Sequence, residues 1–163
     1  MRPGPSNCRA RQRPPASQNH RSIKGTMVAA HAANMALNLL LVEDDLSFAR
    51  SEQTLLESLG YSVTVCSNAK ASMTRLLDER FDLILLDLCL GSSSLAGLGV
   101  IQSLRQLGLK VPPIVITSGN DKALIQWAAA KIQTPYWLQK PFSADELART
   151  IETASPVSGA PVT

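Results

Sequence analysis

Cysteine is scarce in this chain, and its three copies, Cys8, Cys66 and Cys89, are odd in number and widely spaced. No CxxC pair is present, so the sequence offers neither a disulfide framework nor the ligand spacing of a zinc site. We therefore expect a reducing, cytoplasmic environment. No apolar run approaches the roughly 20 residues of a membrane-spanning helix, and no apolar stretch follows the N-terminal arginines as it would in a secretory signal.

Acidic residues are missing from residues 1–36, a segment rich in proline, serine and asparagine that carries six basic residues. Such a segment cannot bury enough apolar surface to offset its ordering entropy. We predict a disordered basic leader over 1–36, one domain over 37–154 and a flexible tail over 155–163. A transit peptide is the second interpretation of the leader. The domain itself is mildly acidic, which argues against a nucleic-acid-binding surface.

Strand and helix patterns alternate five times within the predicted domain. Continuous apolar runs indicate strands buried on both faces, and the alternating YSVTVC indicates a strand nearer the edge. These patterns predict an α/β fold, a doubly wound five-stranded parallel sheet with helices on both faces. The predicted strands are 37–42, 61–66, 82–88, 112–118 and 136–139, and the predicted helices are Phe48 to Leu59, 68–80, 100–108, 121–133 and 143–154.

Acids, hydroxyls and a lysine directly follow the predicted strands. In parallel sheets, ligands bind beyond the carboxyl ends of the strands, where the strand order switches. We therefore expect these side chains to meet in one crevice. They are Glu43 and Asp44 after the first strand, Asp87 at the end of the third, Thr117 and Ser118 at the end of the fourth, and Lys140 after the fifth.

Three carboxylates in one crevice raise one another's pKa unless a cation compensates them. Mg²⁺ prefers oxygen ligands and commonly bridges carboxylates to a phosphate. A carboxylate beside a metal, a hydroxyl and an ammonium suits phosphoryl transfer, in which charge builds on the phosphoryl oxygens. We therefore predict that Asp87 is the nucleophile and that Lys140 and Thr117 stabilise phosphoryl oxygens.

The segments LLLVEDD, DLILLDL, IVITS and WLQKPF, in that order, resemble the four signatures of response-regulator receiver domains in two-component signalling. The resemblance spans residues 38 to about 154 and implies a flavodoxin-like fold. It implies that Asp87 is the phosphoacceptor and that Glu43, Asp44, Asp87 and the backbone carbonyl of Cys89 hold Mg²⁺. It further implies that Thr117 and Ser118 lie at the phosphate, that Lys140 precedes a cis proline, and that Trp137 is an aromatic switch.

By the same resemblance, the chain is a single-domain response regulator or phosphorelay intermediate. A histidine kinase or histidine phosphotransfer protein would donate the phosphoryl group, and a downstream protein would read the result. The domain would catalyse only its own phosphorylation and slow dephosphorylation. We expect no direct DNA binding, because the chain ends after the fifth helix, and no membrane contact. A receiver fragment whose effector lies on another chain is the alternative.

Two other functions stay open, an unphosphorylated pseudo-receiver that serves as a scaffold and a small Mg²⁺-dependent phosphohydrolase. The hydrolase would need an acid two residues past Asp87, where Cys89 stands. The chain also departs from the family pattern. The loop before Gly97 is about two residues longer, and KIQTP replaces a Gly-Ala turn. Neither Cys89 nor Gly119 has a side chain suited to orienting water, which predicts a long-lived phosphoryl group.

Overall fold

The computed structural model describes residues 36–91 and 95–155, in which five strands alternate with five helices. The predicted leader and tail lie outside the described residues, apart from Ala36 and Ser155. No described helix has both the length and the apolar character needed to cross a bilayer. The elements are β1 (Asn38–Val42), α2 (Leu46–Ser58), β2 (Ser62–Cys66), α3 (Ala69–Asp78), β3 (Leu83–Asp87), α4 (Ala96–Gln106), β4 (Ile114–Ser118), α5 (Lys122–Lys131), β5 (Trp137–Gln139) and α6 (Ala144–Ala154).

The five strands form one parallel sheet in the order β2-β1-β3-β4-β5. β2 is an edge strand with a partly exposed middle, as its alternating sequence predicts. The order reverses between β1 and β3, so the crevice beyond their carboxyl ends is the expected ligand site. The predicted fold class is confirmed.

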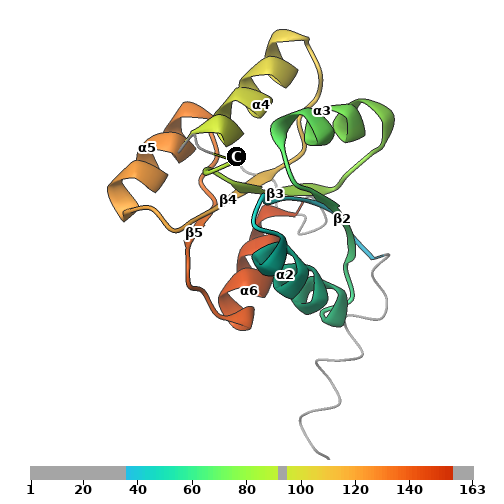
Figure 1. Cartoon of the computed structure of the whole chain (residues 1–163), viewed down its shortest axis with the longest axis vertical. Helices are drawn as coiled ribbons and strands as arrows, with labels where there is room; N and C mark the ends of the chain where they lie inside the picture. Colours follow the sequence, from blue (N-terminus) through green and yellow to red (C-terminus); the bar gives the residue numbers. More distant parts are fainter. Residues whose placement is uncertain (1–35, 92–94, 156–163) are drawn as a thin grey trace, which may run out of the picture. The chain divides into compact units, whose positions relative to one another are not determined.

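Apolar side chains from alternate strand positions form two cores, one on each face of the sheet. Leu40, Leu86 and Ile116 pack on the face covered by α3, α4 and α5. Leu41 and Leu85 pack on the other face, with residues of α2 and α6 (Figure 1). Because both faces are covered, β1, β3 and β4 are almost wholly buried, which explains their uninterrupted apolar sequences.

Helix α4 begins at Ala96, four residues before the predicted start at residue 100. The prediction was wrong because the glycines of LAGLGV indicated a loop. Gly97 instead permits close helix–strand packing, since a Cβ there would overlap the backbone carbonyl oxygen of Asp87. A Cβ built at Gly99 would meet nothing within 4 Å. The first of these glycines therefore serves packing beside Asp87, and the second does not.

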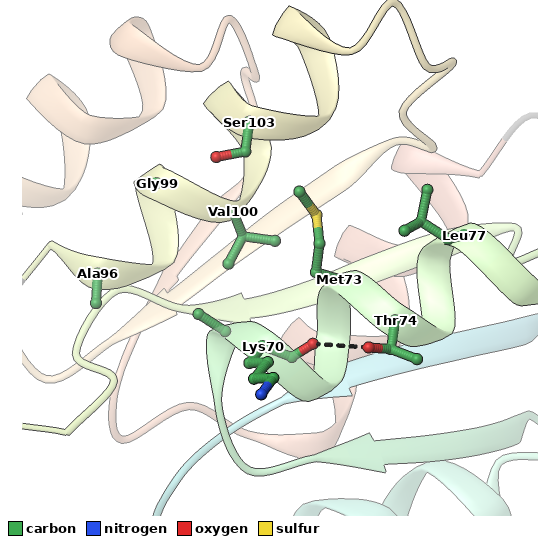
Figure 2. Close-up of a pocket in the computed structure, with 9 residues that line it drawn as sticks. Lys70, Met73, Thr74, Leu77, Ala96, Gly99, Val100 and Ser103 are labelled. Carbon is green, nitrogen blue, oxygen red and sulfur yellow. Dashed lines mark hydrogen bonds between the residues drawn. The ribbon is translucent and has the colours of Figure 1, made fainter.

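An open groove with a volume of about 410 Å³ separates α3 from α4 (Figure 2). Met73 and Leu77 line it from α3, and Gly99, Val100 and Ser103 line it from α4. The missing side chain at Gly99 widens this groove.

The segment KIQTP, which departs from the family pattern, closes α5 with an unusual backbone. Gln133 has φ 53°, in the left-handed region that glycine adopts most easily. Arg105 Nη2 donates to the carbonyl of Ile132 at 2.6 Å, and Thr134 Oγ1 donates to the carbonyl of Ile114 at 2.6 Å. The exit of α5 is therefore tied to α4 and β4.

Candidate functional site

The three predicted carboxylates meet at the carboxyl ends of β1 and β3. Glu43, Asp44 and Asp87 each offer an oxygen, and these oxygens lie within 4.8 Å of one another. Glu43 is 2% exposed and Asp87 6% exposed. A cluster of carboxylate oxygens without nitrogen or sulfur ligands has the donor chemistry that Mg²⁺ prefers. The residues present therefore fit the predicted metal.

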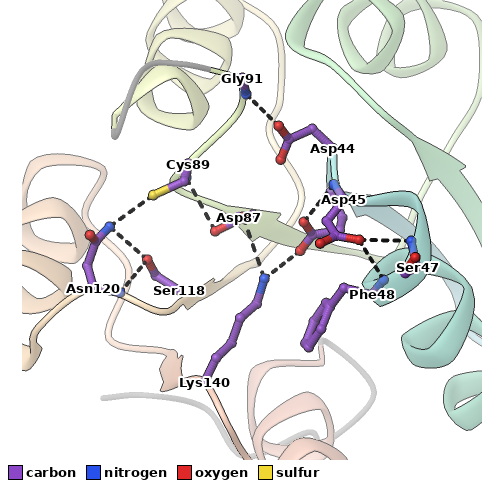
Figure 3. A network of polar contacts seen from close by, with 11 residues as sticks. Asp44, Asp45, Ser47, Phe48, Asp87, Cys89, Gly91, Ser118, Asn120 and Lys140 are labelled. Carbon is purple, nitrogen blue, oxygen red and sulfur yellow. Dashed lines mark hydrogen bonds and ion pairs between the residues drawn. The ribbon is translucent and has the colours of Figure 1, made fainter.

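Lys140 brings the compensating charge from the end of β5 (Figure 3). Its Nζ forms an ion pair with Glu43 Oε2 and lies 3.5 Å from Asp87 Oδ2. The same ammonium lies 4.1 Å from the centroid of the Phe48 ring, which packs edge-on against Phe142. Burial of the pair against this aromatic wall lowers the local dielectric constant and strengthens the attraction. The Lys140–Pro141 peptide bond is cis, as predicted.

The ionisation of Asp87 depends on these neighbours. Burial is the main cause that raises the pKa of its carboxyl, the Lys140 ammonium lowers that pKa, and the Glu43 carboxylate raises it. The backbone N–H of Cys89 donates to Asp87 Oδ1 at 3.3 Å. Asp87 thus faces both a cation and a backbone donor.

The two aspartates after β1 have different tasks. Asp45 caps α2 by accepting hydrogen bonds from the backbone N–H groups of Phe48 at 3.0 Å and Ser47 at 2.8 Å. These bonds hold the pKa of the Asp45 carboxyl below its ordinary value. Asp44 Oδ2 instead accepts from the backbone N–H of Gly91 at 2.7 Å, across the crevice. Asp44 therefore links the β1 exit to the loop after β3.

Thr117 is the neighbour of Asp87 in the register of β3 and β4, and its side chain is fully buried. Within the described residues its Oγ1 has no hydrogen-bond partner. A buried hydroxyl without a partner costs about 1–3 kcal/mol, so such groups call for an explanation. Here the hydroxyl is available to a ligand oxygen beside Asp87.

Ser118, by contrast, has a hydroxyl that is already engaged. Its Oγ accepts from the backbone N–H of Asn120 at 3.2 Å and from Asn120 Nδ2 at 3.0 Å. The same Nδ2 donates to Cys89 Sγ at 3.1 Å. Figure 3 shows Asn120, Ser118 and Cys89 on one side of Asp87 and Asp44 on the other. The predicted phosphate contact of Ser118 stays a prediction, as does the Cys89 carbonyl as a metal ligand.

Trp137 lies on β5, half-buried against the core beneath α3, α4 and α5. Lys122 Nζ is 5.4 Å from the centroid of its ring. Trp137 pairs with Ile116 in the register of β4 and β5, and Ile116 immediately precedes Thr117. The structure therefore puts Trp137 next to the strand that carries Thr117, and its role as a switch stays a prediction.

Sequence reasoning missed two residues near this site. Asn120 carries no pattern of its own, although it follows a strand that ends at a predicted site residue. Glu52 lies on α2, one turn after Phe48, is 3% exposed and has no hydrogen-bond partner for either carboxylate oxygen within the described residues. Burial raises the pKa of Glu52 to about 7; Lys140 lowers that pKa, while Glu43 and Asp87 raise it. An acid on the apolar side of a helix was the available signal.

Comparison with known families identifies one domain. A model of the response regulator receiver domain matches residues 39–152. The receiver domain of the Francisella response regulator 1452 superposes with a TM-score of 0.65 at 23% identity, covering 76% of this chain and 99% of that one. Chemotaxis protein CheY4 of Vibrio cholerae gives a TM-score of 0.66 at 21% identity, over 74% and 99%. These two structures support the fold alone.

Two curated relatives in sequence have the names of transcriptional regulatory proteins. DltR of Streptococcus agalactiae is 34% identical over 111 residues, which is 68% of this chain and 48% of DltR. CrdR of Helicobacter pylori is 33% identical over 119 residues, 72% of this chain and 54% of CrdR. This chain therefore spans about half the length of these relatives. Their names give no support to the expectation that direct DNA binding is absent.

The family match covers most of the chain and all ten described elements except the first residue of β1 and the end of α6. Its residues include each side chain of the crevice at the carboxyl ends of the strands. The chain belongs to the response regulator receiver domains of two-component systems.

Proposed function

We propose that this receiver domain accepts a phosphoryl group on Asp87, with Mg²⁺ held by Glu43, Asp44, Asp87 and the backbone carbonyl of Cys89. The observation that carries the proposal is the buried hydroxyl of Thr117 beside Asp87, which has no hydrogen-bond partner among residues 36–91 and 95–155. A phosphoryl oxygen on Asp87 would give this hydroxyl an acceptor. An interaction scaffold that is never phosphorylated would leave the buried hydroxyl unexplained.

The donor is a phosphohistidine of a histidine kinase or histidine phosphotransfer protein. A carboxylate oxygen of Asp87 bonds to phosphorus, the bond from phosphorus to the imidazole nitrogen breaks, and that nitrogen takes up a proton. When bound, Mg²⁺ neutralises negative charge on the phosphoryl oxygens. Lys140, already 3.5 Å from Asp87, offers a second positive charge, and Thr117 donates a hydrogen bond.

The resulting acyl phosphate adds negative charge to a site whose lysine is paired with Glu43. We infer that Lys140 turns from Glu43 to the phosphoryl group and that Thr117 follows it, which shifts the balance between two conformations. The output is contact with a downstream protein in the cytoplasm. Apart from its own phosphorylation and slow dephosphorylation, the domain catalyses no reaction. A phosphohydrolase is disfavoured because Cys89 stands where that enzyme needs an acid.

The test is incubation of the whole chain with a small phosphodonor, such as acetyl phosphate, and Mg²⁺, followed by intact mass measurement. Wild type is expected to gain the mass of one phosphoryl group, and Asp87→Asn is expected to gain none. Asp78→Asn, an exposed acid on α3, is the matched control and should behave as wild type. A gain that survives in Asp87→Asn would put the acceptor elsewhere.

A further inference from the structure

A polar bridge on one side of Asp87 is not explained by phosphoryl acceptance. Asn120 Nδ2 donates to Ser118 Oγ at 3.0 Å and to Cys89 Sγ at 3.1 Å. We call these two contacts the Asn120 bridge. It connects the exit of β3 with the exit of β4, two segments that are 31 residues apart at Asn120 and Cys89. Figure 3 shows the bridge beside Asp87, opposite Asp44.

The amide of Asn120 is held firmly in this bridge. A side-chain amide has two N–H hydrogens, and both are engaged by the two acceptors. The backbone of the residue is fixed as well, because its N–H donates to Ser118 Oγ at 3.2 Å and its carbonyl accepts from Gln139 Nε2 at 2.9 Å. Hydrogen bonds to residues at the carboxyl ends of β3, β4 and β5 thus hold Asn120 in place. The side-chain N–H hydrogens of Asn120 are therefore not free to direct a water molecule.

The Asn120 bridge links the two segments that lie next to Asp87 in the fold. The backbone N–H of Cys89 donates to Asp87 Oδ1 at 3.3 Å, so Cys89 touches Asp87 directly. Ser118 follows Thr117, the residue paired with Asp87 in the sheet. Ser118 is fully buried, whereas Cys89 and Asn120 are partly exposed. The Asn120 bridge therefore joins a buried hydroxyl to two residues that reach the surface beside Asp87.

We propose that Asn120 is a positioning residue whose bridge to Cys89 restricts water and slows loss of the phosphoryl group from Asp87. The inference rests on the proposed function. In the reaction that it slows, a water oxygen bonds to phosphorus and the bond from phosphorus to the Asp87 oxygen breaks. The products are the Asp87 carboxylate, inorganic phosphate and one proton. A fixed bridge hinders the approach of that water, which must attack roughly in line with the leaving oxygen.

The first experiment measures how fast phosphorylated protein loses its phosphoryl group after the phosphodonor is removed, with Mg²⁺ present. Asn120→Ala is expected to lose it about three to ten times faster than wild type, the effect of one hydrogen bond on a barrier. The initial rate at which the phosphodonor labels the protein should not change. Asn68→Ala, which removes the side-chain cap of α3, controls for general loosening and should keep the wild-type rate.

The second experiment needs no phosphate. A small alkylating reagent modifies the protein, and peptide mass mapping follows the rate at Cys89 alone. Since Asn120 Nδ2 contacts Sγ at 3.1 Å, Asn120→Ala should be alkylated faster at Cys89 than wild type and Asn68→Ala. A double-mutant cycle joins the two experiments. If Asn120 acts through Cys89, adding Asn120→Ala to Cys89→Ala should not accelerate phosphate loss further.

The outcomes separate the two proposals. If wild type takes up no phosphate, the proposed function fails and this inference fails with it. If phosphate is taken up but leaves Asn120→Ala at the wild-type rate or more slowly, only the inference is overturned. A slower rate would mean that the amide directs the water. Equal acceleration in Asn68→Ala, or unchanged alkylation of Cys89, would also overturn it.

Discussion

Glu52 is a carboxyl group inside an apolar helix face, close enough to Lys140, Glu43 and Asp87 for their charges to act on it. Buried acids without a partner hold their proton, because the ionised form loses the solvation that water supplies. The folded protein therefore binds this proton more tightly than the unfolded chain, with a pKa of about 7 against an ordinary 4.5. Stability must then depend on pH.

For this group the stabilising effect of protonation is complete below about pH 4.5 and is lost as the pH rises through about 7. We predict that Glu52→Gln, which cannot ionise, removes this loss. The free energy of unfolding of the variant should exceed that of wild type at pH 8 by up to about 3 kcal/mol. Near pH 4.5 the two should converge. Urea unfolding at a series of pH values measures the difference.

Glu57→Gln, on the exposed side of the same helix, is the control for loss of one acidic group from α2. A gap between Glu52→Gln and wild type that stays constant from pH 4.5 to 8 would show that Glu52 does not titrate in this range.

Single residues also mark where sequence reasoning succeeds. Asp87 could be predicted because it ends an unmistakable apolar run. Lys140 could be predicted because it follows the next predicted parallel strand but one, and parallel strands bring their ends together. Asn120 could not, because its importance comes from two partners that the fold supplies, one of them 31 residues away. Glu52 could not be placed either, since burial of an acid contradicts the rule by which helix faces are assigned.

At the scale of elements, α4 contains two glycines with opposite surroundings. A methyl group at Gly97 would overlap the carbonyl oxygen of Asp87, whereas one at Gly99 would project into open space. Glycine inside a helix is less favourable than alanine by about 0.5–1 kcal/mol. Replacing glycine by alanine should therefore change the free energy of unfolding in opposite directions at these two positions.

We predict that Gly99→Ala raises the free energy of unfolding by about 0.5–1 kcal/mol. Gly97→Ala should lower it by about 1–3 kcal/mol, because α4 must move away from β3. Thermal or urea unfolding of both variants measures the pair, and each serves as the control for the other. Destabilisation by Gly99→Ala would mean that the groove between α3 and α4 closes in solution.

The boundaries of elements show the limit of local patterns. The apolar runs of β1 and β3 were located within one residue at each end. The start of α4 was missed, because glycine signals both a flexible loop and a close approach, and only the position of Asp87 distinguishes them. The exit of α5 was flagged as unusual, but the left-handed backbone of Gln133 depends on contacts with α4 and β4.

At the scale of the molecule, three acids are held together by a fold whose two cores are independent of them. Their mutual repulsion opposes folding, and Lys140 relieves it only in part. A ligand that binds only the folded chain stabilises it in proportion to the logarithm of its concentration. The response of stability to a cation therefore tests the proposed metal site without any phosphodonor.

We predict that Mg²⁺ at about ten times its dissociation constant raises the free energy of unfolding of wild type by about 1.4 kcal/mol. The melting temperature should rise by about 3–6 °C. Asp87→Asn, which removes one ligand, should lose most of this rise, and Asp78→Asn should keep it. Samples with NaCl at equal ionic strength control for screening. An equal rise in Asp87→Asn would show that Mg²⁺ acts elsewhere.

The fold class could be predicted from the sequence because alternating strands and helices obey general rules of connection and burial. The two-sided sheet, its edge strand β2 and the crevice at the switch in strand order all agree with expectation. The hydrogen bonding of each hydroxyl, in contrast, is set by no general rule. Thr117 and Ser118 are adjacent and both buried, yet only Ser118 Oγ has a hydrogen-bond partner within the described residues.

The last strand, β5, has three residues and lies between Pro135 and Pro141. Proline has no N–H to offer a neighbouring strand, so backbone pairing cannot extend in register past either end. The β5 edge of the sheet is thereby poorly suited to pairing with strands of other chains. A protein that docks here meets a surface of side chains, Trp137 among them, so recognition there depends on shape and chemistry and can be changed one substitution at a time.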